Sequence, residues 1–178
     1  MIDKNFISLD LEYNQPSGTI IQVGLVVGNL KTGDILEKYC KCVKVDEIIS
    51  DYIINLTGVT QLDVDNGSKL QDIYNDIVDL SKKYDCFRNP ITWGGGDSID
   101  LRNELKLTDQ DFIFGRRWID AKTLFVSRCF ARELKHQSGL GKSMKRLGLS
   151  FEGRKHNALD DALNTFIIYR KLLEDINI

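Results

Sequence analysis

Two acidic residues, Asp10 and Glu12, lie two positions apart at the end of an apolar run that begins at Phe6. Because successive side chains of a strand point to opposite faces, both carboxylates are expected on the same face. A solvated polar face is the simpler interpretation of such a pair in isolation. Here an apolar strand brings like charges to its C-terminal end, which favours a site for a divalent cation such as Mg²⁺ or Mn²⁺.

A third acid, Asp97, follows the glycines at 94–96, which come directly after the short apolar run at 90–93. Glycines at the end of a strand let the chain turn sharply and let a ligand approach the backbone. An N-cap of the following helix is the more frequent role for an aspartate in this position and stays open. We interpret Asp100 as a surface or capping residue.

A histidine and two further acids, His156, Asp160 and Asp161, open the last predicted helix. The helical period decides which acid faces the sheet, because residues three or four apart share one face. Asp161 belongs to the apolar stripe, whereas Asp160 points elsewhere and is interpreted as a helix-dipole partner or a supporting residue. The stripe comprises Ala158, Asp161, Ala162, Thr165, Ile168 and Tyr169.

The elements that would position these residues follow from the periodicity of apolar side chains. Strands are predicted at 6–12, 20–27 and 35–43, joined by turn-forming residues as three antiparallel neighbours, with short strands at 90–93 and 117–120. Helices are predicted at 46–54, 70–84, 98–105, 122–134, 141–147 and 158–175. This order indicates an α/β fold with a central mixed sheet flanked by helices, forming one domain over residues 1–178.

The charge balance bears on possible partners. With a formal net charge of -2 over 178 residues, the chain has no global attraction for phosphate, so nucleic-acid contacts would need a local basic patch and bound cations. One such patch precedes the histidine, although a solvated helix face explains it equally well; Arg116 and Arg117 form a weaker one. The first patch comprises Lys142, Lys145, Arg146, Arg154 and Lys155.

Cysteine spacing and hydropathy indicate the compartment. The four cysteines are too irregularly spaced for a disulfide framework or an all-cysteine zinc site. Cys40 and Cys42 would share one face of a strand, and we interpret these two as ordinary half-buried thiols. No apolar run approaches the roughly 20 residues of a membrane span. We therefore predict a soluble, cytoplasmic protein that makes no membrane contact.

Three segments resemble the exonuclease motifs of the DEDDh superfamily, in their usual order: Asp10-x-Glu12, Trp93-Gly94-x-x-Asp97 and His156-x-Ala158-x-x-Asp161. The resemblance covers nearly the whole chain, because the segments at 21–24, 55–60, 119–124 and 139–149 also resemble supporting parts of that family. The form of the second and third motifs is most similar to the branch that contains the histone-mRNA and small-RNA 3′ exonucleases and the bacterial KapD-type proteins.

This resemblance implies an RNase H-like fold and a metal-dependent 3′–5′ exonuclease acting on single-stranded 3′ ends, with RNA favoured over DNA. It implies two divalent ions, Mg²⁺ or Mn²⁺, held by Asp10, Glu12, Asp97 and Asp161. His156 would act as general base, a role that suits an imidazole near neutral pH. Substrate contacts are expected from Leu11 and Tyr13, on the last base or sugar, and from Arg154.

Two alternatives stay open at this point. A catalytically silent nucleic-acid or protein binding module on the same fold is disfavoured because all five motif positions are filled. A proofreading-type DNA exonuclease uses the same machinery, and the contacts to a 2′-OH that separate RNA from DNA are not visible in a sequence. The oligomeric state is not predicted.

Overall fold

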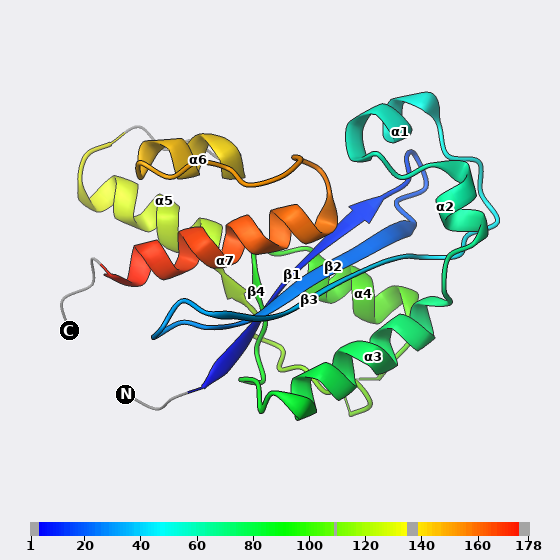
Figure 1. The fold of residues 1–178 in the computed structure, drawn as a ribbon, viewed down its shortest axis with the longest axis horizontal. Helices are drawn as coiled ribbons and strands as arrows, with labels where there is room; N and C mark the ends of the chain where they lie inside the picture. Colours follow the sequence, from blue (N-terminus) through cyan, green and yellow to red (C-terminus); the bar gives the residue numbers. More distant parts are fainter. Residues whose placement is uncertain (1–3, 109, 135–138, 175–178) are drawn as a thin grey trace.

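The central sheet has five strands in the order β3-β2-β1-β4-β5, in a computed structural model that describes residues 4–108, 110–134 and 139–174 (Figure 1). β1 and β2 pair antiparallel, as do β2 and β3, whereas β1, β4 and β5 run parallel. The predicted mixed sheet is confirmed, with β1 in the centre. The strands are β1 (Asn5–Tyr13), β2 (Ile20–Asn29), β3 (Ile35–Cys42), β4 (Ile91–Thr92) and β5 (Ile119–Asp120).

Helices cover both faces of this sheet (Figure 1). α5, α6 and α7 lie on one face, α3 and α4 lie on the other, and α1 and α2 lie beside the end of β1. No described helix is long and apolar enough to cross a bilayer. The helices are α1 (Asp51–Thr57), α2 (Gln61–Asp65), α3 (Leu70–Lys83), α4 (Asp97–Glu104), α5 (Ala121–Ala131), α6 (Leu140–Arg146) and α7 (Ala158–Glu174).

The helix predicted at 46–54 is wrong in its bounds. α1 begins only at Asp51, because the Ser50 side chain accepts a hydrogen bond from the Ile53 amide and caps the helix there. It ends at Gly58, whose φ of 85° gives the left-handed turn typical of a helix C-terminus. The short helix α2 was not predicted; the capping box formed by Thr60 and Asp63 starts it.

β1 separates its side chains between two environments. Ile7, Leu9 and Leu11 are buried in the core that β1 shares with α3. Asp10 and Glu12 alternate with these residues and point toward the opposite face, where α7 lies. The apolar face of β1 therefore packs in the core, and the face that carries the two acids stays available at the C-terminal end of the strand.

Glycines in β2 let α7 lie directly on the sheet. A Cβ at Gly24 would stand 2.1 Å from the backbone carbon of Ala158, and one at Gly28 would stand 2.5 Å from the Phe166 ring. Gly24 is also the β-sheet partner of Asp10. The first turn of α7 is thus packed over the position on β2 that pairs with the first acid.

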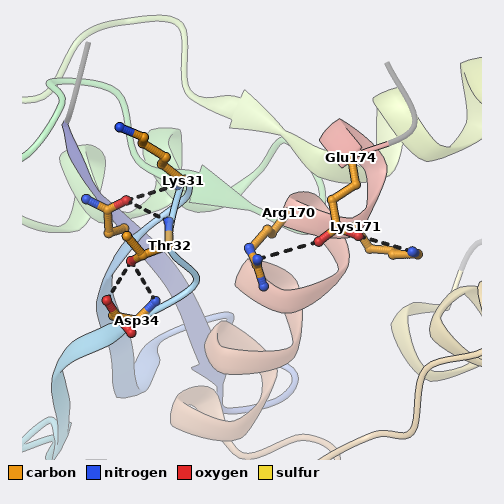
Figure 2. Close-up of polar contacts among 7 residues, drawn as sticks. Lys31, Thr32, Asp34, Arg170, Lys171 and Glu174 are labelled. Atoms are coloured by element: carbon orange, nitrogen blue, oxygen red, sulfur yellow. Dashed lines mark hydrogen bonds and ion pairs between the residues drawn. The ribbon is translucent and has the colours of Figure 1, made fainter. Parts of the chain in front are cut away.

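The other end of α7 lies beside the turn between β2 and β3, where the Arg170 side chain lies against Gly33. Figure 2 shows Lys31, Thr32 and Asp34 of this turn and Arg170, Lys171 and Glu174 of α7. A hollow of about 620 Å³ opens there, lined in part by Lys38 and Arg170. Arg170 follows Asp161 by nine residues, or about 14 Å along the helix axis. This hollow is therefore separate from the acids of the predicted site, Asp10, Glu12 and Asp161.

Candidate metal centre

Four carboxylates meet at the C-terminal end of β1. Asp10 and Glu12 come from β1, Asp97 is the first residue of α4, and Asp161 lies in the first turn of α7. Burial raises the pKa of Asp10 well above its ordinary value of 3.8, and the negative charges of Asp97, Asp161 and Glu12 raise it further. Segments far apart in the sequence thus bring their acids within electrostatic reach of one another.

The other three carboxyl groups show the same effect. Burial, followed by the charges of Asp161 and Asp97, raises the pKa of Glu12 to about 8. Burial also raises the pKa of Asp97 and of Asp161 to about 6. Such shifts mean that the ionised cluster is unfavourable without a compensating positive charge.

The donor atoms at this cluster fit a divalent cation. The ligand atoms of Glu12, His156 and Asp161 all lie within 4.8 Å of one another. Carboxylate oxygens are the ligands that Mg²⁺ and Mn²⁺ prefer, and a bound cation would offset the cost of ionising these buried acids. These residues therefore form a candidate site for a divalent cation.

A turn without a side-chain cap places Asp97 in the cluster. The N-cap of α4 is Gly96, so the alternative role of Asp97 as N-cap is not the one that the structure shows. The Tyr13 hydroxyl lies 3.3 Å from Asp97 Oδ1 and 3.2 Å from Asp100 Oδ2. Burial and these two acids raise the pKa of Tyr13, which keeps its hydroxyl protonated as a donor. Tyr13 thus lies at the edge of the cluster and helps orient Asp97.

The histidine is exposed on the segment before α7 and lies near Glu12 and Asp161, whereas Tyr13 lies near Asp97. His156 adopts a left-handed backbone conformation with φ 59°. Its backbone N–H donates to Asp161 Oδ2 at 3.2 Å. Asp161 therefore orients the residue that carries the imidazole as well as contributing an oxygen to the cluster.

Asp160 does not join the carboxylate cluster, as the helix period predicts. Its Oδ2 accepts a hydrogen bond from the Arg154 amide at 2.8 Å, next to Gly153, whose φ is 77°. The buried Asn164 side chain secures the same segment, donating to the carbonyls of Glu152 and Asp160, each at 2.7 Å. These contacts hold the segment before α7 in place, and they explain why two acids stand side by side.

Two predicted substrate residues are not brought to the carboxylates. The Leu11 side chain is 4% exposed and packs in the core on the far face of β1. The Arg154 guanidinium donates to the Asn55 carbonyl at 2.8 Å and lies against Gly58 at the end of α1. Arg154 thus joins the segment before α7, which carries His156, to α1. Of the three predicted substrate residues, only Tyr13 contacts a cluster carboxylate.

Gln22 is a positioning residue that the sequence did not reveal. It is the β-sheet partner of Glu12 and is 6% exposed. Its Oε1 accepts the Ala158 amide at 2.9 Å and so satisfies one of the free N–H groups at the start of α7. A lone amide side chain within an otherwise apolar strand was the available signal.

The chain matches the exonuclease family model (RNase_T) over residues 2–169. It is 27% identical to ERI1 exoribonuclease 2 of Mus musculus over 183 residues, which cover 89% of this chain and 26% of that protein. It is 23% identical to the probable 3′-5′ exonuclease KapD of Bacillus subtilis (strain 168) over 186 residues, covering 98% of this chain and 87% of that one. The chain thus spans about a quarter of the mammalian relative.

Among solved structures, the nuclease domain of 3′hExo, a DEDDh family member bound to rAMP, superposes with a TM-score of 0.81. The two share 22% sequence identity, and the alignment covers 98% of this chain and 94% of that chain. The predicted RNase H-like exonuclease fold is confirmed by this similarity.

Proposed function

We propose, on the premise that this chain belongs to the exonuclease family (RNase_T), that it removes nucleotides from the 3′ end of single-stranded nucleic acid. The observation that carries the proposal is that five side chains meet at the C-terminal end of the central strand β1: Asp10, Glu12, Asp97, Asp161 and His156. Each residue comes from a segment whose local structure serves to deliver it there. A binding module has no need for four carboxyl groups whose pKa values are raised, mainly by burial, at one place.

Asp10, Glu12, Asp97 and Asp161 would hold two divalent ions, Mg²⁺ or Mn²⁺. When bound, such ions lower the pKa of water and stabilise the charge that develops on a leaving oxygen. The four side chains are held in a largely desolvated place, which strengthens their attraction for the cations.

His156 is the proposed general base. Its imidazole lies within 4.8 Å of carboxylate oxygens of Glu12 and Asp161, so it can take a proton from a water molecule beside them. The proton moves to an exposed side chain, from which it passes to solvent. Because the Asp161 carboxylate accepts the His156 amide, the base and the carboxylate cluster are fixed relative to each other.

RNA is the proposed substrate, supported by the similarity to a protein named an exoribonuclease. Tyr13 is the proposed contact for the terminal nucleotide, because this half-buried side chain brings its hydroxyl to 3.3 Å from Asp97 Oδ1. Leu11 and Arg154 retain indirect roles in this proposal. Leu11 offers its backbone, since its side chain is in the core, and Arg154 keeps α1 next to the histidine segment.

The test is a time course with 5′-labelled single-stranded RNA and DNA of the same sequence, in Mn²⁺, Mg²⁺ or EDTA. We expect a ladder that shortens from the 3′ end in either metal, faster on RNA, and no cleavage in EDTA. Asp10→Asn removes a charge from the cluster at nearly constant shape and serves as the inactive control. Binding of either strand without any cleavage would contradict the proposal and favour a binding module.

A further inference from the structure

A second hollow adjoins the carboxylate cluster on the side of His156. It has a volume of about 370 Å³ and extends from His156 and Asp161 to the first turn of α6. This volume lies within the range of about 300–1,000 Å³ that is typical of small-molecule sites. Its lining is formed by Gly139, Leu140, Gly141, Lys142, Phe151, Lys155, His156 and Asp161.

Two lysines give this hollow a positive wall. Lys142 and Lys155 line it, and within the described part of the chain neither ammonium group has an ion-pair partner. Lys155 lies over the Phe151 ring, with Nζ 6.0 Å from the ring centroid. Gly141 makes room for it, because a Cβ there would stand 2.9 Å from Lys155 Cε. The sequence thus directs the Lys155 side chain across the start of α6.

The two sides of the carboxylate cluster differ in charge. On the Tyr13 side, the hydroxyl meets Asp97 and Asp100, and Asp100 is exposed. On the His156 side, the two lysines line the hollow together with His156 and Asp161. A polyanionic strand crossing the cluster is therefore repelled on one side and attracted on the other.

We propose that Lys142 and Lys155 bind the phosphodiester immediately 5′ of the bond that is cut. This inference rests on the proposed function and assigns the direction of the strand. The terminal nucleotide lies on the Tyr13 side, the scissile phosphate at the carboxylates, and the next phosphate in the lysine-lined hollow. Point-like ammonium groups suit a phosphate that must be released and rebound as the strand shortens.

The experiment compares three RNA substrates by steady-state kinetics. A dinucleotide offers only the scissile phosphodiester, a trinucleotide adds the phosphodiester on its 5′ side, and a third substrate carries a neutral methylphosphonate at that added linkage. We expect the wild-type KM to be roughly tenfold lower for the trinucleotide than for the other two, as one charge-assisted contact would give. The kcat values should be similar.

The double variant Lys142→Gln, Lys155→Gln should lose this advantage while hydrolysing the dinucleotide as the wild type does. Lys31→Gln, Lys38→Gln is the matched control and should keep the advantage. Lys31 lies in the turn drawn in Figure 2, and Lys38 lines the hollow near the far end of α7. Retention of the advantage by the first variant, or equal loss on the dinucleotide, would overturn the proposal. Failure of the wild type to cut any of the three would instead refute the proposed function, and this inference with it.

Discussion

At the scale of single residues, the neighbours Asp160 and Asp161 have different tasks because a helix turns by 100° per residue. Asp161 faces the sheet, where its charge raises the pKa values of Asp10 and Glu12. Asp160 faces the segment before α7 and accepts the Arg154 amide. Two chemically identical side chains are thus distinguished by their position on the helix alone.

We predict opposite outcomes for the isosteric changes Asp161→Asn and Asp160→Asn. The first removes a charge from the cluster and should lower kcat by at least about 100-fold, since even supporting residues of metal sites matter by 10–100-fold. The second keeps an oxygen that can accept the Arg154 amide, so activity should stay within about tenfold. Exonuclease rates of the two purified variants in Mn²⁺ check this. An inactive Asp160→Asn beside an active Asp161→Asn would reverse the assignment.

At the scale of elements, the site depends on how closely α7 approaches β2. Gly24 provides the space and Gln22 provides the hydrogen bond to Ala158, and both belong to the strand that pairs with β1. The same strand therefore aligns the first acids through the sheet and the last acid through the helix. This arrangement makes the geometry of the site a property of packing between elements rather than of any one loop.

Gly24→Ala should move the start of α7 away from β2. Its added methyl would stand 2.1 Å from the backbone of Ala158, which must shift because it has no flexible end to move aside. We expect a loss of about 1–3 kcal/mol in unfolding free energy, typical of overpacking, together with a marked fall in kcat. Denaturant titration and exonuclease rates measure both effects. Gly95→Ala, where no atom lies within 4 Å, is the control and should keep wild-type stability; a Gly24→Ala variant equally stable would contradict the close approach.

Local sequence patterns predicted much of the fold and of the candidate site. Alternation in β1 gave the shared face of Asp10 and Glu12, and the helix period gave the orientation of Asp161, because both depend on neighbours within one element. The close approach at Gly24 and the contact between Gln22 and Ala158 join residues more than 130 positions apart, which no local pattern encodes. For the same reason, the sequence predicted a substrate contact for Arg154 and not its hydrogen bond to the Asn55 carbonyl.

At the scale of the whole molecule, the buried carboxylate cluster lowers the stability of the fold when its acids ionise. Core packing on both faces of the sheet compensates for four acids whose pKa values are raised above 3.8 and 4.5. A carboxyl group with a raised pKa contributes stability below its ordinary pKa and loses it as the pH rises through the folded-state value. The metal-free protein should therefore lose stability as the pH rises above the ordinary values, and this loss is complete near 6 for Asp97 and Asp161 and near 8 for Glu12.

This pH dependence is measurable as the Tm in EDTA. We expect the Tm to fall between pH 5.5 and pH 8.5, and excess Mn²⁺ or Mg²⁺ to restore it at the higher pH by binding the ionised cluster. Glu12→Gln should remove the upper part of the fall, because an amide does not titrate. A Tm that rises steadily over this interval in EDTA would contradict the raised pKa values of these buried acids.

The central claim is that the cluster removes nucleotides from a free 3′ end, and the most direct measurement compares linear with covalently closed circular single-stranded RNA of the same sequence in Mn²⁺. We predict that the wild type degrades the linear strand to mononucleotides and leaves the circle intact, while Asp161→Asn leaves both intact. Cleavage of the circle at a rate comparable to that of the linear strand would contradict the account, because a circle has no 3′ end from which to begin.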